Sequence, residues 1–146
     1  MRLHLLDTMV HLAFRGGRVP EKWTLMWTDI RHGRRSLILV ESIVAETYYQ
    51  ISKTDGEDEA LDHVLWLKGL LRTRVVPVDD NLAMTAGRLR ARYGGKHDLS
   101  LADCFALAAA RHTGAQLVTT EHGLRDCARE LRIDVSWLPR TILERE

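Results

Sequence analysis

The segment LSLADCFALAAARHTGAQLVTTE, residues 99–121, contains a helix, a turn, a strand and an acidic residue, in that order. Ser100–His112 is rich in alanine and predicts a helix that Gly114 ends. Gln116–Thr119 is a short apolar run that predicts a strand, and Glu121 follows it closely. A helix that leads into a strand and then an acid is typical of an α/β protein, in which ligands bind at the carboxyl ends of parallel strands.

Strands and helices alternate in the same way along the rest of the chain. The predicted strands are Arg2–Leu6, Ser36–Val40, Val75–Val78, Gln116–Thr119 and Val135–Leu138. The predicted helices are Thr8–Phe14, Glu21–Arg31, Ser42–Lys53, Ala60–Leu71, a helix that follows Asp79 and Asp80 and ends at Tyr93, Ser100–His112 and Gly123–Leu131. This alternation predicts an α/β fold with a parallel sheet between two layers of helices, and right-handed crossovers leave few topologies. The 146 residues contain no repeat and no linker, so we expect one domain over residues 1–146.

The composition is that of an ordinary globular protein, with 45% hydrophobic and 28% charged residues. A net charge of +1 neither requires nor excludes a nucleic-acid partner, because binding depends on where the basic residues lie. No apolar run approaches the roughly 18 residues of a membrane helix, and the first residues lack the apolar core of a signal peptide. Cys104 and Cys127 are too far apart for a redox pair, so we expect free thiols and a cytoplasmic protein without a membrane partner.

Four acidic residues lie where predicted strands give way to helices: Asp7, Glu46, Asp103 and Glu121. Since the carboxyl ends of parallel strands share one edge of a sheet, these side chains could converge. Two carboxylates about 5 Å apart repel by roughly 3 kcal/mol at an effective dielectric near 20, so four together need a cation. The cluster therefore predicts a divalent metal site. The alternative is that three acids only cap their helices and that Glu46 is solvated.

Other catalytic motifs are missing from the sequence. It has no glycine-rich phosphate loop, no HExxH or GxSxG motif and no Cys/His cluster. A haloacid-dehalogenase-like phosphatase would need a second Asp where Met9 stands. Carboxylate and water oxygens are the ligands that Mg²⁺ and Mn²⁺ prefer, and one or two such ions could activate water for attack on a phosphodiester.

Five segments resemble, in the same order, the PIN-domain family and especially its VapC-type toxins. They are Leu5–Thr8, Val40–Tyr49, Val76–Asp79, Leu99–Ala108 together with Gly114–Glu121, and Ile133–Pro139. The resemblance implies a metal-dependent endoribonuclease that hydrolyses RNA phosphodiester bonds. It also implies a PIN-like three-layer α/β/α sandwich, with a five-stranded parallel sheet in the order 3-2-1-4-5, and commonly a homodimer.

The resemblance also implies roles for the four acids. Asp7, Glu46, Asp103 and Glu121 would be the catalytic cluster, with Mg²⁺ or Mn²⁺ held by Asp7, Asp103 and Glu46. The family more often has Asp in place of Glu121. The longer side chain moves this carboxylate outward, so we expect Glu121 to act through a water molecule.

Two threonines beside the acids have two possible functions. Thr8 and Thr119 could donate hydrogen bonds that orient the metal-binding carboxylates, or they could simply cap the ends of their elements.

Two sets of residues are candidates for contacts with partners. Basic residues could hold RNA phosphates or form ordinary solvated faces: Arg31, Arg34, Arg35, Arg88 and Arg92, and also the pair Arg72 and Arg74. Apolar residues at helical spacing could be core, a dimer face or a groove for an antitoxin helix: Trp23, Trp27 and Ile30 in one helix, and Leu61, Val64, Leu65 and Trp66 in another.

Three functions are therefore compatible with the sequence. The first is the toxin of a toxin–antitoxin pair, an endoribonuclease held inactive by a small antitoxin protein. The second is a PIN-like RNA-binding or assembly module without turnover. The third is a nuclease of RNA maturation without an antitoxin.

Overall fold

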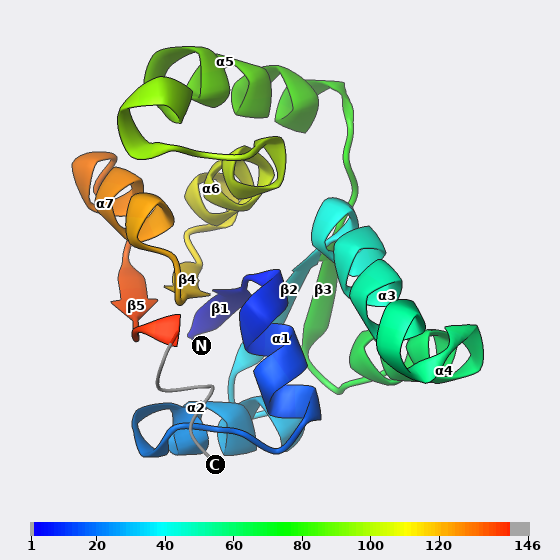
Figure 1. The fold of residues 1–146 in the computed structure, drawn as a ribbon. Helices are drawn as coiled ribbons and strands as arrows, with labels where there is room; N and C mark the ends of the chain where they lie inside the picture. Colours follow the sequence, from blue (N-terminus) through cyan, green and yellow to red (C-terminus); the bar gives the residue numbers. More distant parts are fainter. Residues whose placement is uncertain (1, 141–146) are drawn as a thin grey trace.

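The computed structural model describes residues 2–140 and has a central sheet covered by helices (Figure 1). Its strands are β1 (Leu3–Leu6), β2 (Ser36–Val40), β3 (Thr73–Val76), β4 (Gln116–Thr119) and β5 (Val135–Trp137). Its helices are α1 (Thr8–Arg15), α2 (Glu21–Arg31), α3 (Glu41–Asp55), α4 (Glu57–Lys68), α5 (Asp80–His97), α6 (Leu101–Thr113) and α7 (His122–Glu130). Within the described part of the chain, no helix is both long and apolar enough to cross a bilayer.

The five strands form one parallel sheet in the order β3-β2-β1-β4-β5. Strand β1 lies at the centre, where Leu5 is paired with Ile38 of β2 and Leu117 of β4. This topology confirms the order expected from the resemblance. It also places the ends of β1 and β4 side by side, which brings the residues that follow them to one edge of the sheet.

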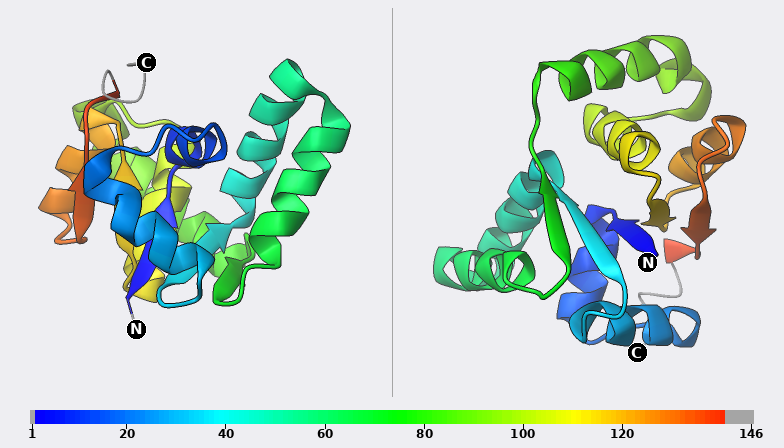
Figure 2. Two further views of the ribbon diagram at one scale, coloured as in Figure 1. Left: turned by 90° about the horizontal axis from the view of Figure 1, so that it is seen from below. Right: turned by 180° about the vertical axis from the view of Figure 1, so that it is seen from behind.

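The core has two layers because successive side chains of a strand point to opposite faces of the sheet. Leu5 and Leu117 pack with α5, α6 and α7 on one face. Their neighbours Leu6 and Val118 pack with α1 and α2 on the other face. The helices therefore cover both faces, as the views in Figures 1 and 2 show, and the three-layer prediction is confirmed.

The aromatic stripe of α2 belongs to the core of this chain. Trp23, Trp27 and Ile30 are all buried, and they pack with Phe14 of α1. The stripe is therefore not a free surface for a second subunit.

Helix α4 differs from α2, because three of its apolar side chains face solvent. Leu61, Leu65 and Trp66 are 48%, 57% and 45% exposed, whereas Val64 is buried. Helices α3 and α4 pack together as a pair that projects from the rest of the molecule (Figure 2). This exposed apolar face lies on that projection.

Helix α5 is longer than the sequence predicted. The expected end was Tyr93, before Gly94 and Gly95, but the helix continues to His97. It ends where Asp98 adopts a left-handed conformation (φ 54°) and donates its backbone N–H to the Gly94 carbonyl. A left-handed C-cap residue is a common helix stop, and here an Asp supplies it in place of a glycine.

Two other element boundaries shift by several residues. Helix α4 begins at Glu57 and not at Ala60, because three acids in its first turn are stabilised by the helix dipole. Strand β3 spans Thr73–Val76 and not Val75–Val78, since Pro77 cannot donate to a strand ladder. The two cysteines are free and buried, in agreement with the expected thiols.

Candidate active site

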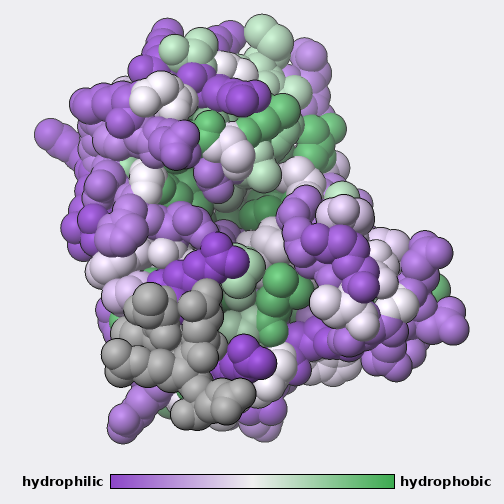
Figure 3. Space-filling model, in the orientation of Figure 1, coloured by the Kyte–Doolittle hydropathy of each residue, from purple (hydrophilic) through white to green (hydrophobic). Residues whose placement is uncertain are grey.

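The four predicted acids line one cavity of about 430 Å³ at the carboxyl edge of the sheet. Asp7 follows β1, Glu46 lies in the second turn of α3, Asp103 lies in the first turn of α6, and Glu121 follows β4. The apolar part of the lining comes from four residues: Met9, Ile43, Ala102 and Ala106. In Figure 3 apolar surface lies near the centre of the molecule's face, between more hydrophilic surfaces on either side.

Asp7 is the buried acid of this cavity, with 8% of its surface exposed. It caps α1, with its Oδ1 accepting the backbone N–H of Val10 at 3.4 Å. The pKa of Asp7 is raised to about 6, chiefly by burial and also by the nearby carboxylates of Glu121 and Asp103, while hydrogen bonds from Thr119 and Val10 oppose the shift. Within the described part of the chain, no basic side chain compensates the charge of Asp7.

Thr119 connects two of the acids through its hydroxyl group. The fully buried Thr119 donates to Asp7 Oδ2 at 2.5 Å and accepts the backbone N–H of Glu121 at 3.0 Å. The last residue of β4 therefore fixes both the carboxylate of Asp7 and the backbone that carries Glu121. Thr8 lines the cavity, but its hydroxyl makes no hydrogen bond to an acid within residues 2–140.

Asp103 caps its helix and lines the cavity at the same time. Its Oδ2 accepts the backbone N–H of Ser100 at 2.9 Å, and Ser100 Oγ accepts the backbone N–H of Asp103 at 3.1 Å. This is the capping box that the sequence predicted. Only one carboxylate oxygen of Asp103 is used by the cap, so the capping and the cluster interpretations are compatible.

Glu46 and Glu121 are held less firmly than the two aspartates. Glu46 Oε1 accepts a hydrogen bond from Gln50 Nε2, one turn further along α3, at 3.0 Å. Glu121 is the N-cap residue of α7, but its side chain makes no capping hydrogen bond. Its carboxylate is therefore not explained by helix capping.

The donor set fits a hard divalent cation, because all four side chains offer carboxylate oxygens. Within residues 2–140, no three acidic, histidine or cysteine side chains lie close enough to chelate an ion as they stand. Mg²⁺ usually keeps several waters and binds through one or two carboxylates, so a complete protein cage is not required. The buried, charge-destabilised carboxylate of Asp7 is the group that would gain most from such an ion.

Three of the arginines considered for RNA binding lie away from this cavity. Arg34 and Arg35 bind the two oxygens of Asp29, at 2.6 and 3.0 Å, just before β2 begins. Arg31 lies over the ring of Trp27, 6.0 Å from its centroid. These groups are at the amino end of the parallel strands, whereas the acids are at the carboxyl end. Their ion pairs could not be read from the sequence.

The other two candidate arginines are exposed on α5. The side chains of Arg88 and Arg92 make no ion pair or hydrogen bond within the described chain. They remain available for a phosphate, and neither lines the acidic cavity.

The sequence analysis missed a group of basic residues beside the acids. A neighbouring cavity of about 430 Å³ shares Asp103 and Glu121 with the first and is also lined by Lys96, His97 and His122. Lys96 and His97 lie in the part of α5 beyond its predicted end, so no helical periodicity indicated them. Both side chains bind Glu130 of α7, at 2.8 and 2.6 Å.

A further basic group approaches the site from the end of the described chain. Arg140 Nη2 lies 3.8 Å from Met9 Sδ, and Met9 lines the acidic cavity. No motif in the sequence pointed to this arginine.

Known proteins share this fold. The family model for the PIN domain matches residues 5–130. The toxin–antitoxin complex VapBC2 of Rickettsia felis, solved with a promoter DNA fragment, superposes with a TM-score of 0.69 at 15% identity over 92% of this chain and 98% of the other. VapC20 of Mycobacterium tuberculosis, a toxin that cleaves the sarcin–ricin loop, gives 0.66 at 16% identity over 84% and 93%. FitAcB of Neisseria gonorrhoeae gives 0.60 at 20% identity over 90% and 95%.

Such identities show a common fold and do not by themselves assign an activity. No curated protein sequence matches the chain. The family model, however, spans most of the 146 residues, and the matched range contains all four acids of the cluster. This chain belongs to the PIN-domain family.

Proposed function

We propose that this protein is a metal-dependent endoribonuclease and the toxin of a toxin–antitoxin pair. The observation that carries the proposal is the convergence of Asp7, Glu46, Asp103 and Glu121 in one cavity of a PIN domain. Structural neighbours described as toxins or toxin–antitoxin complexes support it, although they share only the fold at 20% identity or less.

The four acids divide into metal ligands and positioning groups. Asp7 and Asp103 would hold Mg²⁺ or Mn²⁺ directly, since Asp7 is buried and Asp103 has one oxygen left by its cap. Glu46 would orient the attacking water, and Glu121 would act through a water molecule. The bound cation would supply Lewis-acid stabilisation and an activated water. Thr119 would keep the Asp7 carboxylate in place.

Two kinds of partner follow from the proposal. A small antitoxin protein would cover the site or its surroundings, and the apolar face of α4 (Leu61, Leu65 and Trp66) is a surface that an amphipathic antitoxin helix could use. A second copy of the chain would complete a homodimer. We further propose that residues 1–146 act as one domain in the cytoplasm.

The first experiment is cleavage of a mixed RNA pool by the purified protein with Mg²⁺ or Mn²⁺. Asp103→Asn is the decisive variant, because an amide oxygen can still accept the Ser100 N–H while the ligand charge is lost. Asp62→Asn, on the exposed surface of α4, is the matched control. We expect cleavage by the wild type and the control, and none with EDTA or by Asp103→Asn.

Two results would change the assignment. A folded protein that binds metal and RNA without cleaving any RNA would support the non-catalytic RNA-binding module. Cleavage that continues undiminished in Asp103→Asn would remove the acidic cavity from the proposal. Growth arrest on expression, relieved by a neighbouring gene product, would separate a toxin from a nuclease of RNA maturation.

A further inference from the structure

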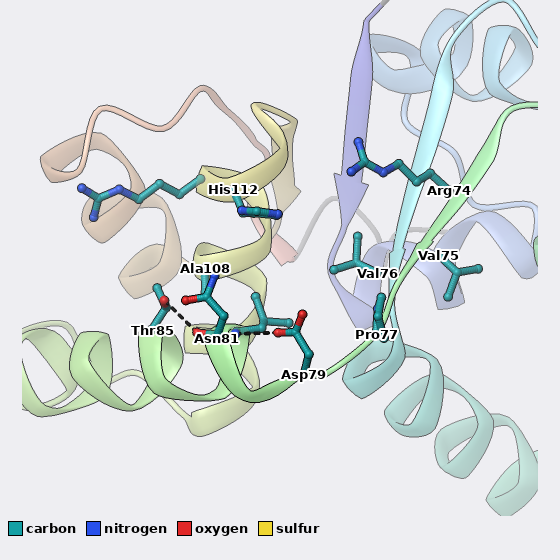
Figure 4. Close-up of a pocket in the computed structure, with 11 residues that line it drawn as sticks. Arg74, Val75, Val76, Pro77, Asp79, Asn81, Thr85, Ala108 and His112 are labelled. Atoms are coloured by element: carbon teal, nitrogen blue, oxygen red, sulfur yellow. Dashed lines mark hydrogen bonds between the residues drawn. The ribbon is translucent and has the colours of Figure 1, made fainter.

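A separate cavity of about 410 Å³ lies at the edge of the sheet beside β3 (Figure 4). Strand β3 and Pro77 form one side, and α5 and the last two turns of α6 form the other. It shares no lining residue with the acidic cavity. Its volume is within the range of about 300–1,000 Å³ that is usual for small-molecule sites.

One end of this cavity is basic. Arg74, Arg111 and His112 line it, and within residues 2–140 none of their side chains makes an ion pair or a hydrogen bond. Arg111 and His112 lie in the last turn of α6, where the helix dipole favours basic residues. Arg74 lies in β3, so the dipole of α6 does not account for its presence. Figure 4 shows Arg74 and His112 pointing toward one another across the cavity. An anionic group between them would be held from two sides.

The other end offers uncharged and acidic hydrogen-bonding groups. Asp79 Oδ1 accepts the backbone N–H of Leu82 at 2.8 Å, and Oδ2 has no partner among residues 2–140. The side-chain amide of Asn81 has no hydrogen bond within the described chain, so both a donor and an acceptor are available. Between the two ends lie the apolar side chains of Val76, Leu82 and Ala108, all buried.

We propose that this cavity binds a nucleoside monophosphate, either free or as the phosphorylated end of an RNA strand. The planar guanidinium of Arg74 matches the oxygens of a phosphate, and a dianionic group suits an end where Arg74 and Arg111 make no ion pair within residues 2–140. The base packs over Val76 and Leu82 while Asn81 pairs with its edge. The site is separate from the acidic cavity, so it does not depend on the proposed nuclease activity.

The test is a binding titration in EDTA, which prevents phosphate from binding through a metal at the acids. AMP, GMP, CMP and UMP are compared with inorganic phosphate and with the four nucleosides. We expect at least one monophosphate to bind about tenfold more tightly than phosphate or its own nucleoside. Amide resonances of Val76, Leu82 and Ala108 should shift on binding.

Two variants identify the site. Arg74→Ala removes an exposed guanidinium of an edge strand, and we expect affinity to fall by about tenfold. Arg129→Ala, at an exposed position of α7 outside the cavity where the side chain makes no ion pair within residues 2–140, is the matched control and should leave affinity unchanged. A 5′-phosphorylated oligonucleotide that binds better than the mononucleotide, while its 5′-hydroxyl counterpart does not, would identify an RNA end as the source.

Three results would overturn the proposal. The first is no binding of any monophosphate by a folded protein, and the second is an equal loss in Arg74→Ala and Arg129→Ala. The third is affinity that disappears as the protein dimerises at higher concentration, which would assign this face to a contact between subunits.

Discussion

The hydroxyl of Thr119 donates a hydrogen bond to the carboxylate of Asp7 across the boundary between β4 and β1. The same oxygen accepts the backbone N–H of Glu121, so one buried side chain orients two acids that are 114 residues apart in the sequence. A parallel pair of strands makes this possible, because both strands end at the same edge. Thr119 is therefore a positioning residue of the proposed site.

Thr119→Val should weaken the proposed nuclease without unfolding the protein. Valine keeps the shape of threonine but cannot donate to Asp7, and a hydrogen bond to a charged group contributes about 1.5–3 kcal/mol. Because this bond lowers the pKa of Asp7, its loss should raise that pKa above about 6. We expect the acid limb of the kcat/KM profile to move to higher pH.

Thr119→Ser is the matched control for that prediction. Serine retains the hydroxyl, so the acid limb should stay near its wild-type position. An unchanged profile in Thr119→Val would show that the bond to Asp7 does not influence the ionisation that activity requires.

Asp7→Asn should abolish cleavage and yet stabilise the metal-free fold at neutral pH. The folded pKa of about 6 exceeds the ordinary value of 3.8, so the wild-type carboxylate favours folding below pH 3.8 and loses that advantage as pH rises through about 6. This pKa difference corresponds to a gain in unfolding free energy of at most about 3 kcal/mol for Asp7→Asn at pH 7. Urea unfolding in EDTA measures it.

The same experiment at pH 4 should show a much smaller difference between Asp7→Asn and the wild type. Added Mg²⁺ or Mn²⁺ should stabilise the wild type and leave the variant unaffected. A variant that is less stable than the wild type at pH 7 would mean that the ionised Asp7 is better compensated by the fold than its burial indicates.

The two aspartates of the cluster could be predicted from the sequence because each follows a local pattern that also fixes its place in the fold. Asp7 comes directly after an apolar strand, and Asp103 lies in a capping box. The basic residues could not be predicted, because charge alone does not show pairing. Arg34 is bound to Asp29 at the opposite edge, whereas Lys96 reaches the site only because α5 continues past two glycines.

The buried His11 of α1 and the half-buried His63 of α4 should make stability depend on pH. Burial, with a smaller contribution from the neighbouring His63, lowers the pKa of His11 to about 3. Burial, with a smaller contribution from Arg15, lowers the pKa of His63 to about 4. Both nitrogens of His11 lack a partner within the described chain. The neutral forms favour folding above pH 6.5, and this contribution is lost as pH falls toward 4 and then 3.

His11→Leu should therefore flatten the decline of unfolding free energy between pH 6.5 and 4. At pH 7 the variant should be as stable as the wild type or about 1 kcal/mol more stable, because unpaired buried nitrogens are removed. His32→Gln, at an exposed position, should keep the wild-type slope. If His11→Leu also kept the wild-type slope, His11 would have to take up its proton as readily in the folded protein as in the unfolded chain.

Gly123→Ala should destabilise the protein and disturb the proposed site together. A Cβ at Gly123 would lie 2.0 Å from the carbonyl oxygen of His97 and 3.2 Å from its carbon, and backbone cannot yield as a flexible side chain can. Helix α7 would have to move away from the end of α5, taking Glu121 with it. Overpacking of this kind costs about 1–3 kcal/mol, and cleavage should fall as well.

Gly87→Ala is the control for Gly123→Ala, because it adds the same methyl group in α5 without a clash. Gly87 lies inside α5, and a Cβ there meets no atom within 4 Å. Alanine should therefore stabilise the helix by about 0.5–1 kcal/mol and leave cleavage unchanged. Urea unfolding of both variants, with RNA cleavage measured on the same preparations, tests the contact. If Gly123→Ala proved as stable and as active as Gly87→Ala, the close approach of α7 to His97 could not be what positions Glu121.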